Sequence, residues 1–443
     1  MRIRLSDHFT YGRLLRYTFP SMVMMVFTSI YSIVDGLFVS NYVGKEAFAA
    51  VNLVYPVFMI ISAIGFMLGT GGSAIVAQAL GEKRNEQAQE YFSMLVFVTF
   101  WLGVAATVLC EIFLKPLTGL LGASGKLQEY SILYGRFTTL SMPFFMLLTS
   151  FQMYFNVAEK PKAGLAVTVM AGGANIVLDF LLVGVFRFGL VGAAVATNIS
   201  EILGGVIPVI YFLRKNDSLL RLRRAHFEGR VFLKACTNGS SEMLSSISSS
   251  VVSILYNYRL LELTGADGVA AYGAIMYMAF IFAAILMGYA NGSAPIVSYQ
   301  YGAQNQAELK NLFKKSLIII GGMDLVMFLL AEMCADPVTW IFVGYDTGLH
   351  AMTRVGFRIF SLSFLIVGFT IYGSAFFTAL GDGGVSAFLS FSRTFVFQIG
   401  AVLLLPALLG LTGIWFSTVA AELCSLAVTI GFWTAKKKKY GYA

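Results

Sequence analysis

The sequence predicts an all-α polytopic membrane protein with twelve transmembrane helices, arranged as two pseudo-twofold-related six-helix bundles. Composition is the first reason, since 58% of the 443 residues are hydrophobic and only 12% are charged, whereas soluble domains carry about 25% charged residues. The second reason is that apolar stretches long enough to span a bilayer, about 20 residues each, recur along the whole chain. The third is a repeat that relates the two halves of the chain.

Twelve apolar stretches are separated by short polar connectors. The spans expected in the first half are 14–40, 50–79, 90–114, 130–157, 163–186 and 190–213. Those expected in the second half are 233–262, 269–300, 311–331, 351–380, 384–408 and 411–434. We therefore expect a first bundle over residues 1–213, a basic cytoplasmic connector over 214–230, and a second bundle with a lysine-rich tail over 231–443.

The basic residues predict the orientation. Three segments hold about half of the 31 basic residues: the first sixteen residues, the connector with its edge, and the tail at Lys436–Lys439. Basic loops stay in the cytoplasm, and all three segments can lie there only if each half crosses the membrane an even number of times. We expect the chain to lie in a bacterial inner or plasma membrane, with both termini on the cytoplasmic side. The net charge of +8 is thus explained by topology, and no nucleic-acid partner is expected, because the charge lies in short loops without interleaved aromatic residues.

A sequence pattern occurs twice, once in each half of the chain. The pattern GLxGxxxxTxxxE begins at Gly189 and begins again at Gly410. The same separation, called here the repeat offset, relates Gly71 to Gly292 and Gly81 to Gly302. Because each half has an even number of spans, both halves face the same way, and the pseudo-twofold axis runs along the membrane normal. Folds of this kind bind substrate between their halves and rock one half against the other.

Ionisable side chains inside the spans are the candidate functional residues, because each costs roughly 2.5–3.5 kcal/mol at mid-membrane. At ~1.5 Å of rise per residue, Asp35, Asp179 and Thr197 each lie roughly 10–12 Å from the outer end of a different span. Three helices are therefore expected to place oxygen atoms at one level in the outer half of the membrane.

Each of these three residues has a polar neighbour four positions away on the same helix face. The pairs are Tyr31 with Asp35, Asn175 with Asp179, and Glu201 with Thr197. Such a cluster suits a hard cation such as sodium, held by several oxygens. It equally suits a shared proton, because two close carboxylates in low dielectric cannot easily both ionise. The alternative is an inert hydrogen-bonded cluster that fixes helix packing.

The second half offers a different set of polar residues. Glu242 lies in the segment GSSEMLSSISSS, where the serines are expected either to hydrate it or to let helices approach closely. Tyr256 stands one repeat offset after Asp35, so the ion site is expected mainly in the first half. Asp324 and Arg393 are expected to pair with each other or to line the cavity.

No feature of the sequence indicates an enzyme. The four cysteines and three histidines lack metal-ligand spacing, and no GxxxxGK[ST] loop for nucleotide phosphates is found. We expect no cofactor, and we expect an ion gradient of Na+ or H+ to supply the energy.

Five segments of the first half are characteristic in their order: IVDGLFVSNYVGKEAFAAV (33–51), GTGGSAIVAQALGEKR (69–84), NVAEKPKAG (156–164), NIVLDFLLV (175–183) and GLVGAAVATNISEIL (189–203). Through these segments and the duplicated halves, the chain resembles the multidrug and toxic compound extrusion (MATE) transporters over essentially its whole length. The resemblance implies two six-helix bundles around a central cleft, and export of bulky, often cationic compounds coupled to sodium or proton entry. It is strongest toward the bacterial DinF/MepA-like branches.

The resemblance also implies roles for particular residues. The cation site of the family corresponds here to Tyr31, Asp35, Asn175, Asp179 and Thr197. The ligands of Na+, if sodium is the coupling ion, would be Asp35 and Asp179. Further candidates for substrate binding or coupling are Gln152, Asn156, Glu201, Glu242 and Arg393. The tenth span has no acid before Asp382, unlike members that use a second-bundle sodium site.

The expected function is an antiporter that exports organic cations by alternating access and that works as a monomer in the lipid bilayer. The main alternative is a flippase for a lipid-linked precursor. A flippase would require a large cationic cavity, whereas Arg393 is the main basic residue in the middle of a span.

Overall fold

The computed structural model describes residues 3–442, and no strand forms within that range. The helices of the first half are α1 (Tyr11–Phe38), α2 (Lys45–Gly81), α3 (Asn85–Leu120), α4 (Gly125–Leu140), α5 (Met142–Val157), α6 (Pro161–Asp179) and α7 (Gly189–Leu213). Those of the second half are α8 (Gly229–Thr264), α9 (Ala266–Gly302), α10 (Gln306–Val343), α11 (Thr347–Ser361), α12 (Val367–Ala379), α13 (Gly383–Phe391), α14 (Gln398–Leu409) and α15 (Leu411–Tyr440). Wider π-helical turns extend or join them at η1 (Val39–Val43), η2 (Phe180–Val185) and η4 (Ser392–Phe397), and a 3-10 turn forms η3 (Leu362–Leu365).

The helices form twelve segments of membrane-spanning length, which is consistent with the predicted count. In the described part of the chain, nine are long and apolar enough to cross a membrane as single helices, and a pair bent by 42° between α11 and α12 makes a tenth. The other two are α4 with α5, which are separated at Ser141, and α8, whose serines make it more polar. The predicted all-α class with two six-helix bundles is confirmed.

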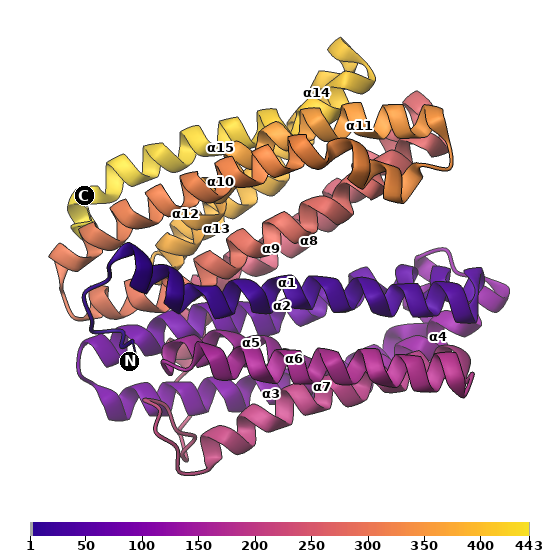
Figure 1. The fold of residues 1–443 in the computed structure, drawn as a ribbon. Coiled ribbons are helices and arrows are strands. Elements are labelled where there is room, and N and C mark those ends of the chain that lie inside the picture. Colours follow the sequence, from indigo (N-terminus) through magenta and orange to yellow (C-terminus); the bar gives the residue numbers. More distant parts are fainter. Residues whose placement is uncertain (1–2, 443) are drawn as a thin grey trace.

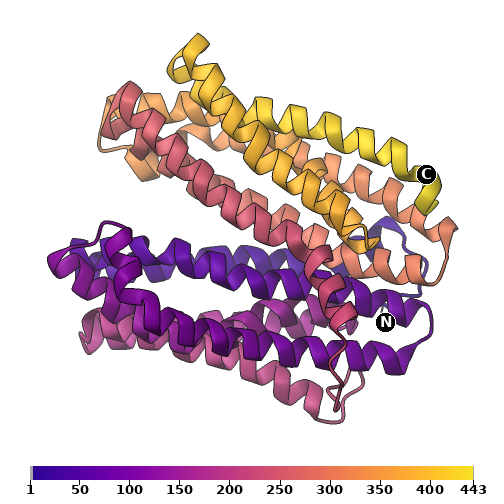
Figure 2. The same ribbon diagram turned by 180° about the vertical axis from the view of Figure 1, so that it is seen from behind.

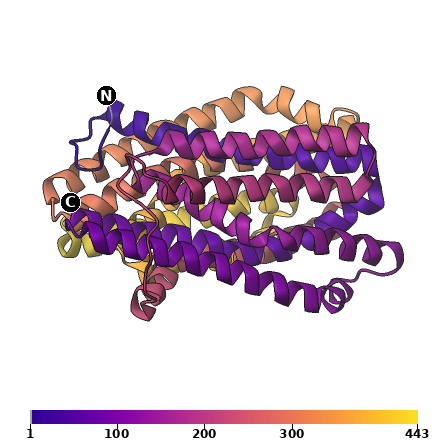
Figure 3. The same cartoon turned by 90° about the horizontal axis from the view of Figure 1, so that it is seen from below.

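The two bundles form a V (Figure 1). Helices α1–α7 pack together as one arm and α8–α15 as the other, and the view from behind shows the same separation (Figure 2). Both chain termini lie at one end of the molecule, called here the terminal end (Figures 1 and 3). The arms meet at this end and diverge toward the opposite, far end (Figures 1 and 2).

Aromatic packing inside the bundles reflects the internal repeat. In the first bundle the rings of Phe92 and Phe212 lie 5.1 Å apart, between α3 and α7. Their counterparts one repeat offset later, Phe313 and Trp433, lie 5.3 Å apart between α10 and α15. The same pair of positions therefore builds the core of each bundle, as expected for a duplicated unit.

The contact between the bundles is also symmetric. A Cβ atom at Gly81 on α2 would overlap the carbonyl oxygen of Tyr299 on α9. A Cβ atom at Gly302 would likewise overlap the carbonyl oxygen of Gln78. The repeat offset relates Gly81 to Gly302 and Gln78 to Tyr299, so the pseudo-twofold axis passes through this crossing of α2 and α9.

An N-terminal strap, residues 3–10, ties the two bundles together at the terminal end. The backbone N–H of Leu5 donates to Glu159 Oε1 of the first bundle at 2.8 Å, and Gln300 Nε2 of α9 donates to the Leu5 carbonyl at 2.8 Å. The N–H of Phe9 donates to Glu308 Oε1 of α10 at 2.9 Å. Leu5 and Phe9 are fully buried, so the strap is an integral part of the packing.

Candidate cation site

Close packing of α1 on α6 positions the candidate site. A Cβ atom at Gly172 on α6 would lie 2.6 Å from Phe27 and 2.7 Å from Tyr31 on α1. Only glycine allows this approach. Phe27 precedes Asp35 by eight residues and Gly172 precedes Asp179 by seven, about 12 and 10.5 Å of helical rise, so the approach brings both carboxyl groups to nearly one level.

The carboxyl groups of Asp35 and Asp179 face each other at close range. Asp179 is fully buried and ends the regular part of α6, whereas Asp35 is half-buried near the end of α1. A π-helical turn follows each of them, η1 after α1 and η2 after α6. Single π-helical turns inside α-helices are rare, and they occur frequently at functional sites.

Five buried oxygen atoms lack a hydrogen-bond donor here. They are Asp35 Oδ1, Asn175 Oδ1, Asp179 Oδ1 and Oδ2, and Thr197 Oγ1. A buried acceptor without a partner is costly, about 1–3 kcal/mol each and more for a charged group. Oxygen atoms gathered from α1, α6 and α7 are therefore suited to a hard cation or a proton, either of which would satisfy them.

The remaining member of the expected group, Glu201, joins the same cluster from α7. It lies within electrostatic range of Tyr31 and Asp35, and beside Ser141 at the junction of α4 and α5. We call Tyr31, Asp35, Asn175, Asp179, Thr197 and Glu201 the first-bundle cluster. The group contains three carboxylates, but among the described residues no three His, Cys, Asp or Glu side chains are arranged to hold one metal ion.

Two tyrosines that the sequence analysis missed also border the cluster. Tyr55 of α2 lies within electrostatic range of Asp35 and Glu201, and Tyr134 of α4 lies within range of both of these and of Asp179. Nothing in the sequence distinguishes them from the many other tyrosines near span ends, because their role depends on which helices become neighbours.

Gln152 and Asn156 lie closer to the terminal end than the cluster does. Gln152 Nε2 donates to Thr168 Oγ1 on α6 at 3.4 Å, and Thr168 precedes Asn175 by seven residues, about 10 Å along the helix. Asn156 Oδ1 accepts from Ser21 at 2.9 Å, and its Nδ2 donates to the carbonyl of Asn291 across the bundle junction at 3.5 Å. Asn156 thus helps to join the bundles.

Glu242 lies on α8 of the second bundle, apart from the first-bundle cluster, and is half-buried. Two of the nearby serines bond to their own helix: Ser246 Oγ donates to the Glu242 carbonyl at 3.0 Å and Ser250 Oγ to the Ser246 carbonyl at 3.1 Å. The hydroxyls of Ser246 and Ser250 therefore do not donate to the Glu242 carboxylate, as they would if they served to hydrate it.

Arg393 pairs with Glu422, which corrects the expected pairing with Asp324. Arg393 Nε donates to Glu422 Oε1 at 2.8 Å, and Thr370 Oγ1 donates to Glu422 Oε2 at 2.6 Å. Asp324 is 1% exposed and faces Gly368 at the start of α12. The expected pairing was wrong because η4 and α15 are adjacent, whereas the side chain of Asp324 points to the break between α11 and α12. The alternative, that the two residues line the cavity, stays a prediction.

In the second bundle, the polar side chains at the position equivalent to the first-bundle cluster hydrogen-bond to one another. Tyr256, the counterpart of Asp35, bonds to Thr418 Oγ1 at 2.9 Å and donates to Gln398 Oε1 at 3.2 Å. Arg393 supplies a fixed positive charge beside Glu422. The pairing also neutralises the main mid-span cation that a flippase for pyrophosphate-linked lipids would require.

The two halves match one family model separately. The MatE model matches residues 20–181 and again residues 242–404. The multidrug export protein MepA of Staphylococcus haemolyticus is 24% identical over 410 residues, covering 92% of this chain and 90% of the relative. MepA of Staphylococcus aureus strain MRSA252 is 24% identical over 422 residues, covering 94% and 92%.

The fold is also found among solved structures. An outward-facing multidrug resistance MATE family transporter of the MOP superfamily superposes with a TM-score of 0.93, at 23% identity and 98% coverage of both chains. At this identity the likeness establishes the arrangement of the helices and no more.

Proposed function

The chain belongs to the MatE family, and from this premise we propose that it exports organic cations across the membrane in exchange for sodium ions or protons. Relatives named as multidrug export proteins align along more than nine-tenths of the chain. The proposal places the coupling ion at the first-bundle cluster and the organic cation between the two bundles.

The observation that carries the proposal is the set of buried oxygens without donors on α1, α6 and α7. A desolvated pair of carboxylates attracts positive charge strongly, and a small ion or proton bound there removes that attraction for a larger cation. Exchange of one positive charge for another needs no ATP, because the concentration gradient of the ion drives it. The membrane potential adds about 2.3 kcal/mol per 100 mV only for each net charge that the exchange moves across the membrane.

The V-shaped arrangement of the bundles supports an alternating-access cycle (Figure 1). In this conformation the bundles diverge at the far end, so ion loading takes place from that side. Loading neutralises Asp35 and Asp179, α1 repacks at its π-helical turn η1, and the organic cation is released. The return step discharges the ion at the terminal end.

We place the terminal end on the cytoplasmic side of a bacterial plasma membrane. It carries both termini and the connector between the bundles, the segments where basic residues concentrate, and basic loops stay in the cytoplasm. One chain contains both bundles and the cluster, so a monomer is sufficient for transport.

The decisive experiment measures ethidium accumulation in cells that express Asp35→Asn or Asp179→Asn. We expect each substitution to raise accumulation to the level of cells without the protein, because an amide cannot neutralise a cation or carry a proton. Asp267→Asn, which changes an exposed carboxylate at the start of α9, is the matched control and retains efflux. Intact efflux in both cluster variants would contradict the proposal.

The coupling ion is tested in proteoliposomes with a sodium gradient and a pH gradient imposed separately. Uptake of a fluorescent cation that responds to one gradient alone identifies the ion. Uptake that responds to neither gradient would contradict ion coupling.

A further inference from the structure

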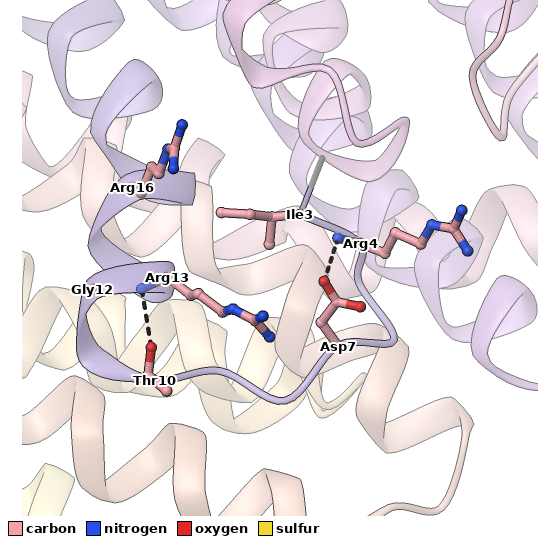
Figure 4. A pocket seen from close by; sticks show the side chains of 7 residues that line it. All are labelled: Ile3, Arg4, Asp7, Thr10, Gly12, Arg13 and Arg16. Atoms are coloured by element: carbon pink, nitrogen blue, oxygen red, sulfur yellow. Dashed lines mark hydrogen bonds between the residues drawn. The ribbon is translucent and has the colours of Figure 1, made fainter. Parts of the chain in front are cut away.

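A pocket of about 680 Å³ opens at the terminal end, between the N-terminal strap and the first turns of α1 (Figure 4). Its lining residues are Ile3, Arg4, Asp7, Thr10, Gly12, Arg13 and Arg16. It lies where the first candidate membrane span begins, at Tyr11. A pocket beside the start of a span is expected at the height of the lipid headgroups, and no residue of the first-bundle cluster lines it.

Positive charge dominates this pocket. Three arginines line it against one carboxylate, Asp7, whose Oδ2 is already engaged by the backbone N–H of Arg4 at 3.1 Å. Arg13 extends across the pocket and donates to the carbonyl of His8 at 3.1 Å, and Arg16 follows it on α1 (Figure 4). Within residues 3–442, neither Arg4 nor Arg16 has an ion-pair partner. Guanidinium groups match phosphate oxygens in geometry and in charge.

The start of α1 adds a second feature that favours an anion. The amide groups in the first turn of a helix have no carbonyl partner within that helix and point toward its N-terminus. Gly12 lines the pocket, and nothing lies within 4 Å of the position that a Cβ atom would occupy there. Thr10 Oγ1 already accepts from the N–H of Arg13 at 3.4 Å, so an anionic oxygen that approaches the helix backbone closely would meet the amide groups of Tyr11 and Gly12.

An exposed apolar stripe begins beside the pocket and runs toward the membrane interior. Tyr11, Leu15 and Phe19 are 42%, 40% and 61% exposed. Their spacing of four residues places them on one face of α1. A soluble phosphate would make no use of this stripe, whereas an acyl chain attached to the phosphate would lie along it.

We propose that this pocket binds the headgroup phosphate of an anionic phospholipid from the cytoplasmic leaflet, with an acyl chain along Tyr11, Leu15 and Phe19. The inference rests on the orientation given under the proposed function. Because the strap bonds to both bundles, the bound lipid fixes the strap and favours the conformation in which the bundles meet at the terminal end.

The test measures lipid binding to the purified full-length protein in neutral detergent, by fluorescence of a headgroup-unmodified phosphatidylglycerol with a labelled acyl chain. Phosphatidylcholine with the same label is the reference. We expect Arg13→Gln/Arg16→Gln to weaken phosphatidylglycerol binding by about fivefold per arginine removed. Arg223→Gln/Arg224→Gln removes the same charge from the exposed connector and is expected to bind as the unmodified chain does.

The single variant Arg16→Gln controls for loosening of the strap when Arg13 is replaced. Arg16 makes no hydrogen bond to any described residue, so its loss leaves the strap in place. About fivefold weaker binding in this variant supports the site. Equal losses in the connector variant, or equal affinity for phosphatidylcholine, would overturn it. Glycerol 3-phosphate is the other arm: if it displaces the labelled lipid at the concentration at which the intact lipid does, the ligand is a soluble phosphate and the lipid assignment is wrong. Binding is read without transport, so failure here is separate from failure of the efflux test.

Discussion

Gly172 is the residue that lets the first-bundle cluster form, because it allows the Phe27 and Tyr31 rings of α1 to contact the backbone of α6. Two carboxylates on separate helices interact only when the helices are this close. The sequence identified Asp35 and Asp179 through their depth along the helix. Depth along a helix gives no information on the distance between two helices. The close approach of α1 and α6 depends on Gly172.

We predict that Gly172→Val separates α1 from α6 and reduces efflux. Overpacking of a close contact costs about 1–3 kcal/mol, so affinity for the coupling ion is expected to fall about tenfold. The matched control is Gly173→Val, since a Cβ atom at Gly173 meets nothing within 4 Å. Ethidium efflux at several sodium concentrations and pH values measures the change, and equal efflux in the two variants would show that this contact does not set the site.

The Arg393–Glu422 pair makes the second bundle different from the first. Glu422 is 3% exposed and accepts bonds from both Arg393 and Thr370. Removing one partner of a buried ion pair leaves a charge uncompensated, whereas replacing both with apolar groups is often neutral.

We therefore predict that Arg393→Gln destabilises the protein by about 3–5 kcal/mol. The double variant Arg393→Met/Glu422→Leu is expected to recover most of this loss. Thermal unfolding in detergent measures both. A double variant as unstable as the single one would mean that Arg393 acts through packing and not through charge compensation.

At the scale of single elements, the junction of α12 and α13 is held to the C-terminal helix through Asp382. Its Oδ2 accepts from Tyr440 Oη at 2.6 Å and lies 3.5 Å from Lys436 Nζ. Partial burial tends to raise the pKa of Asp382, but the Tyr440 hydrogen bond and the lysine charges outweigh it and hold the pKa below its usual value.

A lowered pKa in the folded state sets the sign of a pH effect. The ionised carboxylate stabilises the folded state above the unfolded-state pKa of about 3.9, and this stabilisation is lost as the pH falls through the lower folded-state value. We predict that the unfolding temperature of the native chain exceeds that of Asp382→Asn at pH 6 and that the difference shrinks toward pH 3. A constant difference over this range would contradict the assignment.

The helices themselves were largely predictable from hydropathy. Each of the twelve predicted spans falls on a helical segment of the structure, because about 20 consecutive apolar residues can satisfy their backbone in lipid only as helix. The break at Ser141 between α4 and α5 was not predicted. Pro143 lies two residues after the break and has no N–H to donate to the carbonyl of Thr139. That carbonyl accepts from Thr107 Oγ1 on α3 at 2.7 Å instead.

At the scale of the whole molecule, the bundles are joined by contacts that repeat across the pseudo-twofold axis. Gly81 and Gly302 each admit the backbone of the opposite bundle. Any larger side chain at either position must push the bundles apart at the terminal end. If the bundles are pushed apart at the terminal end and pivot as rigid bodies, their far ends should move closer together.

We predict that Gly81→Leu or Gly302→Leu shortens the distance between spin labels at positions 120 and 408, in a cysteine-free background. Leu120 and Leu408 are 86% and 78% exposed, at the far ends of the first and second bundles. Gly273→Leu on α9 is the control, because nothing lies within 4 Å of a Cβ atom there. An unchanged distance in all three variants would show that these glycines do not hold the open conformation.

Hydropathy, basic residues and the repeat offset determined the membrane class, the number of spans and the duplication, because each of these is a property of one segment or of a comparison along the chain. The depth of Asp35, Asp179 and Thr197 followed in the same way from helical rise. Only the tertiary structure decided that Tyr55 and Tyr134 border the cluster, that Arg393 bonds to Glu422, and that the strap joins both bundles. These contacts depend on which helix faces meet, and that is set by packing between segments far apart in sequence.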